Sequence, residues 1–212
     1  MIVVHHLQTS QSERIVWLCE ELGIPYELRL YQRDPATQMA PAEYRKLHAM
    51  GTAPVITDGH TVLAESGAIM DYIIHKLADG RLAVAPASQN YADYVFWYHF
   101  ANASLLGNEV IGVVASMLGG DQGNPMIASV RERSDRAFAL VENTVANRTF
   151  LAGEFTAADI INFFPLSTAR AFTSRNLSQF PNLRAYLKRL TDRPAFRRAK
   201  EKADPDLPLL ID

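Results

Sequence analysis

The spacing of hydrophobic residues changes along the chain. The first part alternates short runs typical of a β-strand with longer runs that have the period of a helix. Residues 2–6 read IVVHH, a short run typical of a strand. The segment after it carries apolar residues at i, i+3, i+4 and i+7, namely Ile15, Leu18, Cys19 and Leu22. This order predicts a strand followed by a helix with one buried face.

The end of this helix and the next strands are marked by turn residues. Gly23 suits the left-handed position that ends many helices, and Pro25 prevents the helix from continuing. Residues 26–30 alternate with period two, so they predict a second strand, which can pair in parallel with the first across a helical crossover. Residues 54–57 and 61–65 flank a tight Asp-Gly turn and predict an antiparallel hairpin.

The remainder of the chain has a helical pattern. Residues 66–77 predict a helix directly after the hairpin. From about residue 88 the strand pattern is absent, and residues 88–118 and 125–146 predict two long helices separated by the break GGDQGNP. Residues 79–88 are expected to link the two parts.

Residues 155–160, FTAADI, predict the start of a helix. Thr156 can accept the amide of Asp159, whose carboxylate reaches back, while the flanking apolar residues form a hydrophobic staple. This pattern predicts a structural role for Asp159. Pro165 lies further into the same helix and predicts a kink.

Composition and charge narrow the class of protein. The chain has 212 residues, 48% hydrophobic and 21% charged, as in ordinary globular proteins. A formal net charge of −2 argues against nucleic acid or an anionic membrane as the main partner. No apolar run approaches the roughly 18 residues that span a bilayer, and residues 1–10 lack the features of an export signal. We therefore expect a cytoplasmic protein.

The metal-binding and redox residues are few. Cys19 is the single cysteine, which excludes an intrachain disulfide, and its place on an apolar helix face predicts a small core residue. His5 and His6 point to opposite faces of the first strand and lack neighbouring cysteines or paired carboxylates. They are expected to be surface or core histidines, and no metal site is predicted.

Candidate binding chemistry surrounds the hairpin. Pro54 begins a strand and pushes Ala53 to an extended backbone, whose free amide and carbonyl suit an extended peptide. Ser66 starts a helix, where unpaired amides favour an anion, and Glu65 can hold an ammonium group. Together they suit the head group of an α-amino acid. The alternative is that Ser66 only caps the helix and Glu65 is solvated.

These features carry a resemblance to a known family. The order strand, helix, strand, helix, hairpin, helix, with APV before the hairpin and ESGAI after it, resembles the thioredoxin-like domain of cytosolic glutathione transferases. Residues 96–105 and 155–160 are similar to the fourth and sixth helices of that superfamily. Residues 1–35 are similar to its serine- or threonine-type bacterial and fungal branch, with HHL, RI, WL and EELG in place.

The resemblance implies a fold and a co-substrate. It implies an α/β thioredoxin-like domain over residues 1–80, an all-α domain over residues 88–212, and a two-fold homodimer. It also implies that Pro54 is a cis-proline and that glutathione is the co-substrate. The cysteinyl part of glutathione would pair with the backbone of Ala53, and its γ-glutamyl end would bind Glu65 and Ser66.

One position departs from the family pattern. Related chains often carry Lys or His beside the proline, where it meets the glycine carboxylate of glutathione. This chain has Thr52 there, which provides no charge. The residues that remain as substitutes are Arg33, Gln38 and Lys46.

A hydroxyl is expected to activate the thiol of glutathione. A thiol with a pKa near about 8.5 is mostly protonated at neutral pH, and a hydrogen-bond donor aimed at sulfur favours the anion. In the loop LQTSQSERI, Ser10 matches the cysteine of cysteine-type relatives and Thr9 matches the hydroxyl of serine-type relatives. Ser12 is a third candidate or the N-cap of the following helix. Arg14 either strengthens the field at sulfur or forms a surface ion pair.

Three functions follow from these residues and the resemblance. The first is a glutathione transferase that attacks small apolar electrophiles lodged between the domains, in detoxification. The second is a glutathione-dependent disulfide or peroxide reductase, which Thr9 favours. The third is a non-catalytic protein that binds apolar ligands, which the missing cation at Thr52 favours. Aromatic residues of the helical half either line the electrophile pocket or pack in the core; they are Tyr94, Trp97 and Tyr98, together with His99.

Overall fold

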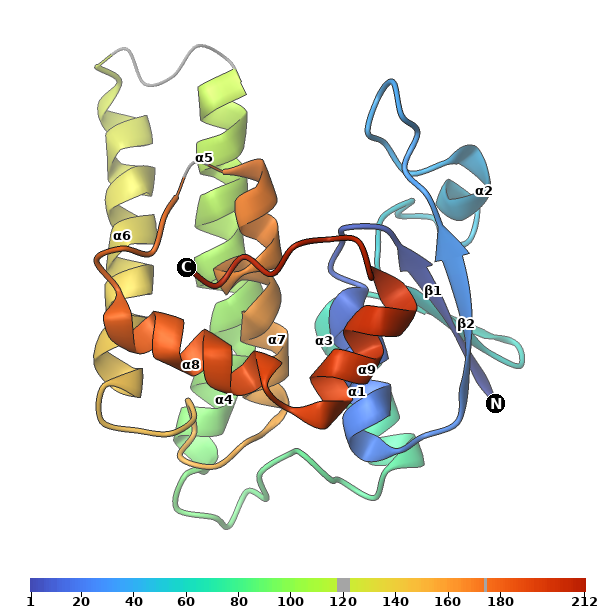
Figure 1. The fold of residues 1–212 in the computed structure, drawn as a ribbon. Coiled ribbons are helices and arrows are strands. Elements are labelled where there is room, and N and C mark those ends of the chain that lie inside the picture. The colour runs from blue at the N-terminus through green and yellow to red at the C-terminus, as the bar shows by residue number, and fades with distance from the viewer. Residues whose placement is uncertain (118–122, 174) are drawn as a thin grey trace. The chain divides into compact units, whose positions relative to one another are not determined.

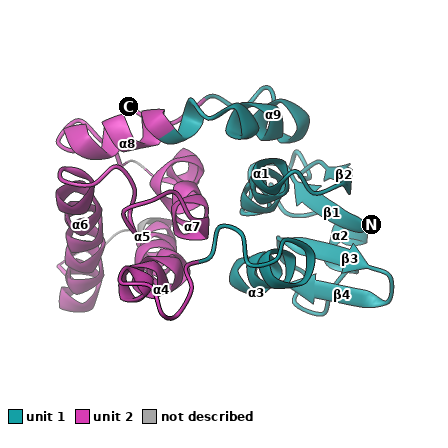
Figure 2. Cartoon of the chain, turned by 90° about the horizontal axis from the view of Figure 1, so that it is seen from below, with its two compact units in different colours: residues 1–83, 190–208 teal, residues 84–189, 209–212 magenta. Residues whose placement is uncertain are grey.

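The computed structural model describes residues 1–117, 123–173 and 175–212, which form two compact units (Figures 1 and 2). Unit 1 comprises Met1–Ala83 and Leu190–Pro208, and unit 2 comprises Val84–Arg189 and Leu209–Asp212. The expected division into 1–80 and 88–212 therefore differs from the structure in one respect. Residues 190–208 pack with the first unit, although they lie far from it in sequence.

A four-stranded sheet forms the centre of unit 1. Its strands are β1 (Ile2–Leu7), β2 (Tyr26–Tyr31), β3 (Val55–Asp58) and β4 (Thr61–Ala64), in the order β2-β1-β3-β4. β1 and β2 run parallel, whereas β3 is antiparallel to both β1 and β4. The parallel pair and the hairpin that the sequence predicts are both confirmed.

Helices cover this sheet. They are α1 (Glu13–Leu22), α2 (Ala42–Arg45), α3 (Ser66–Tyr72), which continues into the π-helical turn η1 (Ile73–Leu77), and α9 (Pro194–Ala203). α1 and α3 lie on the same side of the sheet (Figure 2). The predicted buried face of α1 is confirmed, since Ile15, Leu18 and Cys19 have no exposed surface. Gly23 ends this helix with a φ of 64°, a left-handed backbone that glycine adopts without strain.

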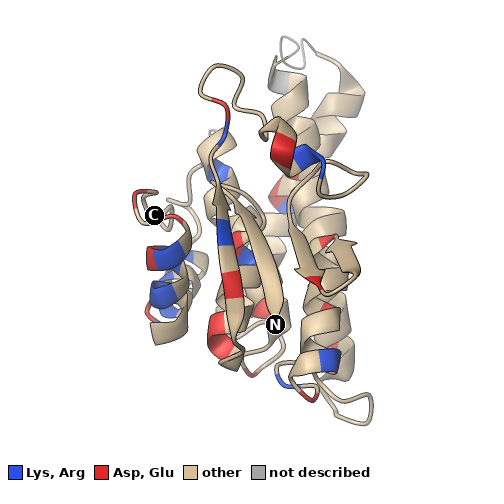
Figure 3. Cartoon of the chain, turned by 90° about the vertical axis from the view of Figure 1, so that its right-hand side faces the viewer, with Lys and Arg blue, Asp and Glu red and all other residues tan. Residues whose placement is uncertain are grey.

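The return of α9 to unit 1 has an apolar and an ionic cause. The ring of Phe196 meets Trp17 of α1 edge-on, with centroids 5.1 Å apart, and both side chains are buried. Basic residues are grouped on α9 (Figure 3), and Arg198 lies 2.9 Å from the carboxylate of Glu20 on α1. The repeated basic positions near the C-terminus thus serve as partners for the acidic end of α1.

Unit 2 is built from helices. They are α4 (Tyr91–Phe100), the π-helical segment η2 (Ala101–Leu106), α5 (Gly107–Met117), α6 (Pro125–Val145), α7 (Ala157–Leu166), the 3₁₀ turn η3 (Thr168–Phe172) and α8 (Pro181–Thr191), whose last two residues cluster with unit 1. The helix expected over 88–118 is the continuous run α4, η2 and α5. The break expected at 119–125 falls largely outside the described residues. No helix of the described chain is both long and apolar enough to cross a bilayer.

The helix start at Thr156 is confirmed as a capping box. The Thr156 hydroxyl accepts from the first turn of α7, and the Thr156 N–H donates to the Asp159 carboxylate at 2.9 Å. The same buried carboxylate accepts the Leu151 N–H at 3.0 Å and the Tyr186 hydroxyl at 2.8 Å. Pro165 lies inside α7, one residue before the helix ends at Leu166, and the kink stays a prediction.

Asp159 also makes the stability of the protein depend on pH. Burial raises the pKa of this carboxyl to about 6 from an ordinary 3.8, although the bonds from Leu151, Thr156 and Tyr186 act in the opposite direction. A raised pKa means that the folded state holds the proton more tightly than the unfolded state. The stabilisation linked to this proton is therefore complete below about pH 4 and is lost as the pH rises through about 6.

Replacing Asp159 by Asn is expected to lower the free energy of unfolding by about 2 to 3 kcal/mol, because the amide cannot accept all of these donors. Urea unfolding between pH 4 and 7 measures both effects, and the stability advantage of wild type should shrink as the pH rises. Asp71→Asn, at an exposed position of α3, is the matched control and should change little. Equal stability of wild type and Asp159→Asn across this range would contradict the assignment.

Candidate functional site

The loop between β1 and α1 presents two buried hydroxyls. The Oγ atoms of Ser10 and Ser12 lie 2.7 Å apart, and the Ser12 N–H also donates to Ser10 Oγ at 3.3 Å. Both side chains are buried, while Thr9 is half-buried and has a φ of 49°. The loop thus turns sharply at Thr9 and points Ser10 into a hydrogen-bonded interior.

Ser12 occupies the N-cap position of α1, but its side chain makes no capping hydrogen bond. The expectation that its hydroxyl caps the helix is wrong. Its Oγ instead accepts the N–H of Leu7 at 3.1 Å and lies 2.9 Å from Nδ1 of His6. Leu7 and His6 therefore bind the Ser12 hydroxyl that the local sequence pattern predicts to cap the helix.

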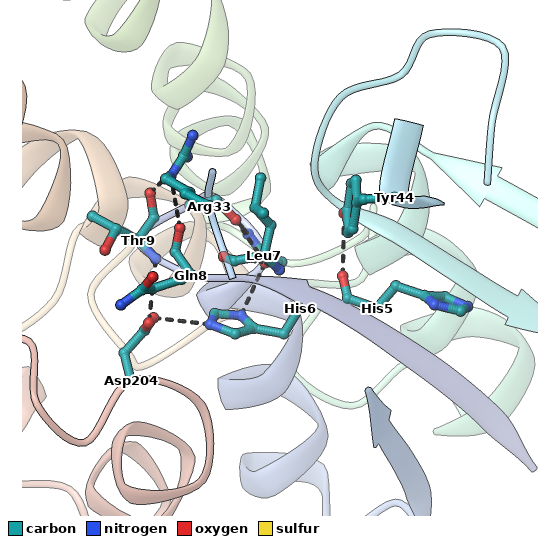
Figure 4. Close-up of polar contacts among 10 residues, drawn as sticks. His5, His6, Leu7, Gln8, Thr9, Arg33, Tyr44 and Asp204 are labelled. Atoms are coloured by element: carbon teal, nitrogen blue, oxygen red, sulfur yellow. Dashed lines mark hydrogen bonds and ion pairs between the residues drawn. The ribbon is translucent and has the colours of Figure 1, made fainter. Parts of the chain in front are cut away.

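His6 and Asp204 extend this network (Figure 4). Nε2 of His6 lies 2.9 Å from Oδ2 of Asp204, and Oδ1 of the same carboxylate accepts the Thr9 N–H at 3.2 Å. Burial disfavours ionisation of Asp204, but the hydrogen bonds from His6 and from the Thr9 N–H hold its pKa below the ordinary value. The sequence analysis gave Asp204 no role. It lies 198 positions from His6, and no local pattern connects the two.

Arg33 holds the same loop from the other side (Figure 4). Its guanidinium donates to the carbonyl oxygens of Gln8 at 2.9 Å, Thr9 at 3.0 Å and Gln38 at 2.8 Å. Burial lowers the pKa of this group. Arg33 therefore braces the loop backbone in this structure, and the contact with a ligand carboxylate that the sequence analysis considered stays a prediction.

The hairpin residues lie at the same end of the sheet. The Ala53-Pro54 peptide bond is cis, as the resemblance implies. Val55 pairs with His5, so these residues lie next to the end of β1. The loop between β1 and α1, residues 8–12, begins at that end and is called the serine loop. Pro54 is buried, Ala53 is half-buried, and Thr52 is exposed. An extended ligand that pairs with the Ala53 backbone would thus run close to the loop.

Glu65 and Ser66 are joined to this loop by a residue that the sequence analysis missed. Glu65 is exposed and has a φ of 72°, whereas Ser66 is buried at the start of α3. The Ser66 hydroxyl donates to Oε1 of Gln11 at 3.1 Å, and Arg14 donates to the same oxygen at 3.0 Å. Arg14 is fully buried, so the alternative of a surface ion pair for it is wrong. Ser66 and Arg14 are thereby joined to the loop between β1 and α1 through Gln11.

A cavity lies within unit 2. It has a volume of about 980 Å³ and is lined by residues of α5 and α6 and by Phe172, Thr173, Arg175, Asn176, Gln179 and Phe180. Its wall is polar at Glu109, which accepts from the hydroxyl of Ser134 and lies 3.3 Å from the guanidinium of Arg175. The aromatic residues considered for an electrophile pocket lie elsewhere in this unit. Three of them are buried, namely Tyr94, Trp97 and Tyr98.

The described residues contain no group of three or more His, Cys, Asp or Glu side chains placed to hold a metal ion. The side chains at the loop supply hydroxyls, one imidazole, one carboxylate and the guanidinium groups of Arg14 and Arg33. These groups can donate and accept protons, and they can orient a thiol.

Comparison with known proteins gives the family. Residues 10–76 match the glutathione S-transferase N-terminal domain, and residues 91–194 match the C-terminal domain. Glutathione S-transferase 3 of Schizosaccharomyces pombe is 32% identical, with 96% of this chain and 88% of the relative covered.

Solved structures agree. A glutathione S-transferase of Actinobacillus pleuropneumoniae has a TM-score of 0.87 and 34% identity, with 96% of this chain and 93% of that chain covered. A glutathione transferase of Phanerochaete chrysosporium, solved with oxidized glutathione, has a TM-score of 0.74 and 22% identity over 96% and 95% of the two chains, which supports the fold alone. The thioredoxin-like and all-helical fold class and the glutathione-dependent transferase class expected from the sequence are confirmed, and the chain belongs to the glutathione S-transferase family.

Proposed function

We propose that this protein binds glutathione at the end of the sheet where the serine loop, Ala53-Pro54 and Ser66 meet, and that the thiolate of glutathione attacks small apolar electrophiles, so that the whole molecule is joined to them through sulfur. The observation that carries the proposal is the convergence of a peptide-pairing backbone, a buried serine at a helix start and a pair of hydrogen-bonded hydroxyls. The relatives bear transferase names and so do not favour a disulfide or peroxide reductase or a non-catalytic binding protein.

We assign Ser10 as the residue whose hydroxyl binds and activates the thiol of glutathione. Its oxygen is held by the hydroxyl and the N–H of Ser12, which supports a fixed orientation. A fixed donor or acceptor stabilises a developing charge better than a mobile one, because it does not have to reorient. Thr9 remains the alternative, since it precedes Ser10 directly. Its backbone contacts with Asp204 and Arg33 support a role in shaping the loop.

The location and the wider role are part of the same proposal. A cytoplasmic protein that acts in detoxification is consistent with a thiol transferred to apolar electrophiles, and both remain predictions from the sequence. The second substrate is expected to contact the helical unit. The polar wall of its cavity at Glu109 and Arg175 is a poor match for an apolar molecule, so other surfaces are expected to receive it.

Homodimer formation is also proposed. The run α4, η2 and α5 exposes large apolar side chains whose exposed fractions lie between 48% and 52%, namely Phe96, Val110, Ile111 and Val114. Exposed apolar patches of this kind mark contact surfaces in soluble proteins. The two-fold homodimer implied by the family resemblance supplies the partner, a second copy of this chain.

Glutathione binding tests the assignment of Ser66. Ser66→Ala removes a hydroxyl donor from the expected γ-glutamyl end and should weaken binding about tenfold, because one hydrogen bond contributes roughly 1 to 1.5 kcal/mol. Calorimetric titration of reduced glutathione measures this change. Ser88→Ala, at an exposed serine, should bind like wild type. Unchanged affinity in Ser66→Ala would remove this residue from the site, and no binding to wild type would remove the proposed function.

Turnover tests the assignment of Ser10. Ser10→Ala should lower kcat/KM for conjugation of an aryl halide by about 10- to 100-fold at neutral pH, because less of the bound thiol is ionised. Thr9→Val keeps the shape of the side chain and should retain most activity. The reverse pattern would assign the thiol to Thr9. Faster turnover of hydroperoxides or disulfides than of aryl halides would favour the reductase.

Charge placed on the apolar surface tests the dimer. Val114→Glu should convert the dimer to a monomer, because the carboxylate would lose its water on association. Size-exclusion chromatography with light scattering measures the mass. Asn147→Glu, at an exposed polar position after α6, should leave the dimer intact. A monomeric wild type, or a dimeric Val114→Glu protein, would contradict this surface.

A further inference from the structure

Four buried side chains form a continuous hydrogen-bonded chain that ends at the proposed thiol site. Ser10 Oγ lies 2.7 Å from Ser12 Oγ, which lies 2.9 Å from His6 Nδ1. His6 Nε2 lies 2.9 Å from Asp204 Oδ2 (Figure 4). None of the four residues is more than 5% exposed. Protons can move along such a chain because each link is at hydrogen-bond distance.

The direction of each hydrogen bond follows from its partners when the imidazole is neutral. An ionised Asp204 only accepts, so Nε2 of His6 carries the ring proton and Nδ1 accepts. Ser12 must then donate to Nδ1, while its oxygen accepts the Leu7 N–H and the hydroxyl proton of Ser10. Ser10 has used its proton within the chain and offers a lone pair to a ligand. In this state it can accept a thiol proton.

The opposite arrangement results when His6 is protonated. Both ring nitrogens then donate, and Ser12 accepts from His6 and Leu7. The hydroxyl of Ser12 donates to Ser10, whose own proton becomes available to a ligand. In this state Ser10 donates to a thiolate. The protonation of His6 therefore decides whether Ser10 accepts from sulfur or donates to it.

We propose that this chain carries the thiol proton of bound glutathione to His6. The inference rests on the proposed function, because it requires the sulfur of glutathione at Ser10. The S–H bond breaks as sulfur gives its proton to Ser10. Ser10 passes its own proton to Ser12, and Ser12 passes its proton to Nδ1. The products are a thiolate that accepts from Ser10 and an imidazolium paired with Asp204. No atom or electron leaves the system.

His6 and Asp204 act through other residues, so they are positioning residues and do not touch the sulfur. Asp204 selects the tautomer of His6 that accepts at Nδ1 and is an ionised partner for the imidazolium. Its other oxygen holds the Thr9 N–H and so fixes the loop that carries Ser10. A purely structural histidine would satisfy its two partners without this link to the ligand loop.

Several charged groups lie around Asp204 and act on its pKa. The guanidinium of Arg33, which follows β2, acts on Asp204. Lys200 of α9 also lowers the pKa of Asp204. The charges of Glu13 on α1 and of Asp206 after α9 in turn favour the protonated form of Lys200. The two cations favour the Asp204 carboxylate. Asp204 is the anion in direct contact with the imidazole of His6.

The first test is a pH titration of the thiolate absorbance of glutathione bound at saturation. In wild type the apparent pKa of the bound thiol should lie at least one unit below the ordinary value of about 8.5. Asp204→Asn and His6→Asn should each raise it by one unit or more and lower kcat/KM about tenfold on the acidic side. Asp71→Asn, at an exposed position of α3, is the control and should leave the profile unchanged. An unshifted thiol pKa in both folded, glutathione-binding variants would overturn the relay.

The second test uses wild type and is independent of how the variants fold. With ¹⁵N-labelled histidine, NMR should show that His6 gains a proton when reduced glutathione binds. S-methylglutathione has no thiol proton and should leave the ring signals of His6 as they are in the free protein. Binding of both ligands with the same His6 state would overturn the relay but keep the proposed function. Binding of neither ligand would overturn both.

Discussion

The contact between Asp204 and the end of β1 is the interaction on which the site depends. One carboxylate receives the imidazole of His6 and the backbone N–H of Thr9, and so joins a segment after α9 to the loop before α1. Arg33, which follows β2, donates a hydrogen bond to the carbonyl oxygen of Thr9. Both polar groups of the Thr9 peptide backbone are thereby bound. A non-glycine residue with a positive φ costs of order 1 kcal/mol or more, and these two bonds offset that cost.

Much of the fold could be predicted because its signals are local. The apolar period of α1 and the Asp-Gly turn of the hairpin each lie within a few residues, and both predictions are confirmed. The Asp159 capping box is local in the same way. The site was predictable only in part. Ser10 and Ser66 stand out by sequence, but Asp204, which accepts the Thr9 N–H, and Gln11, which accepts from Ser66, lie far from these partners in the chain and carry no pattern of their own.

The errors have the same physical origin. Ser12 was expected to cap α1 because serine at a helix start usually binds a first-turn amide. In the fold, the Ser12 hydroxyl binds the buried imidazole of His6 and the N–H of Leu7, while the first-turn N–H groups of α1 donate to the backbone carbonyls of Ser10, Gln11 and Ser12. A continuous second domain was expected because the helical pattern of residues 190–208 follows directly on that of the preceding helices, and nothing local shows that these residues cluster with the first unit. In both cases a distant segment overrides a local preference.

The position of Asp204 is set mainly by apolar packing. The ion pairs between α9 and α1 have half-exposed basic partners, such as Arg198, and exposed pairs of this kind contribute about 0.2 to 1 kcal/mol. Burial of Phe196 against Trp17 contributes roughly 2 to 3 kcal/mol and does not weaken with salt. The hydrophobic seam between α1 and α9 therefore keeps the carboxylate against His6. Because α1 also begins at the serine loop, the same seam fixes both ends of the hydrogen-bonded chain.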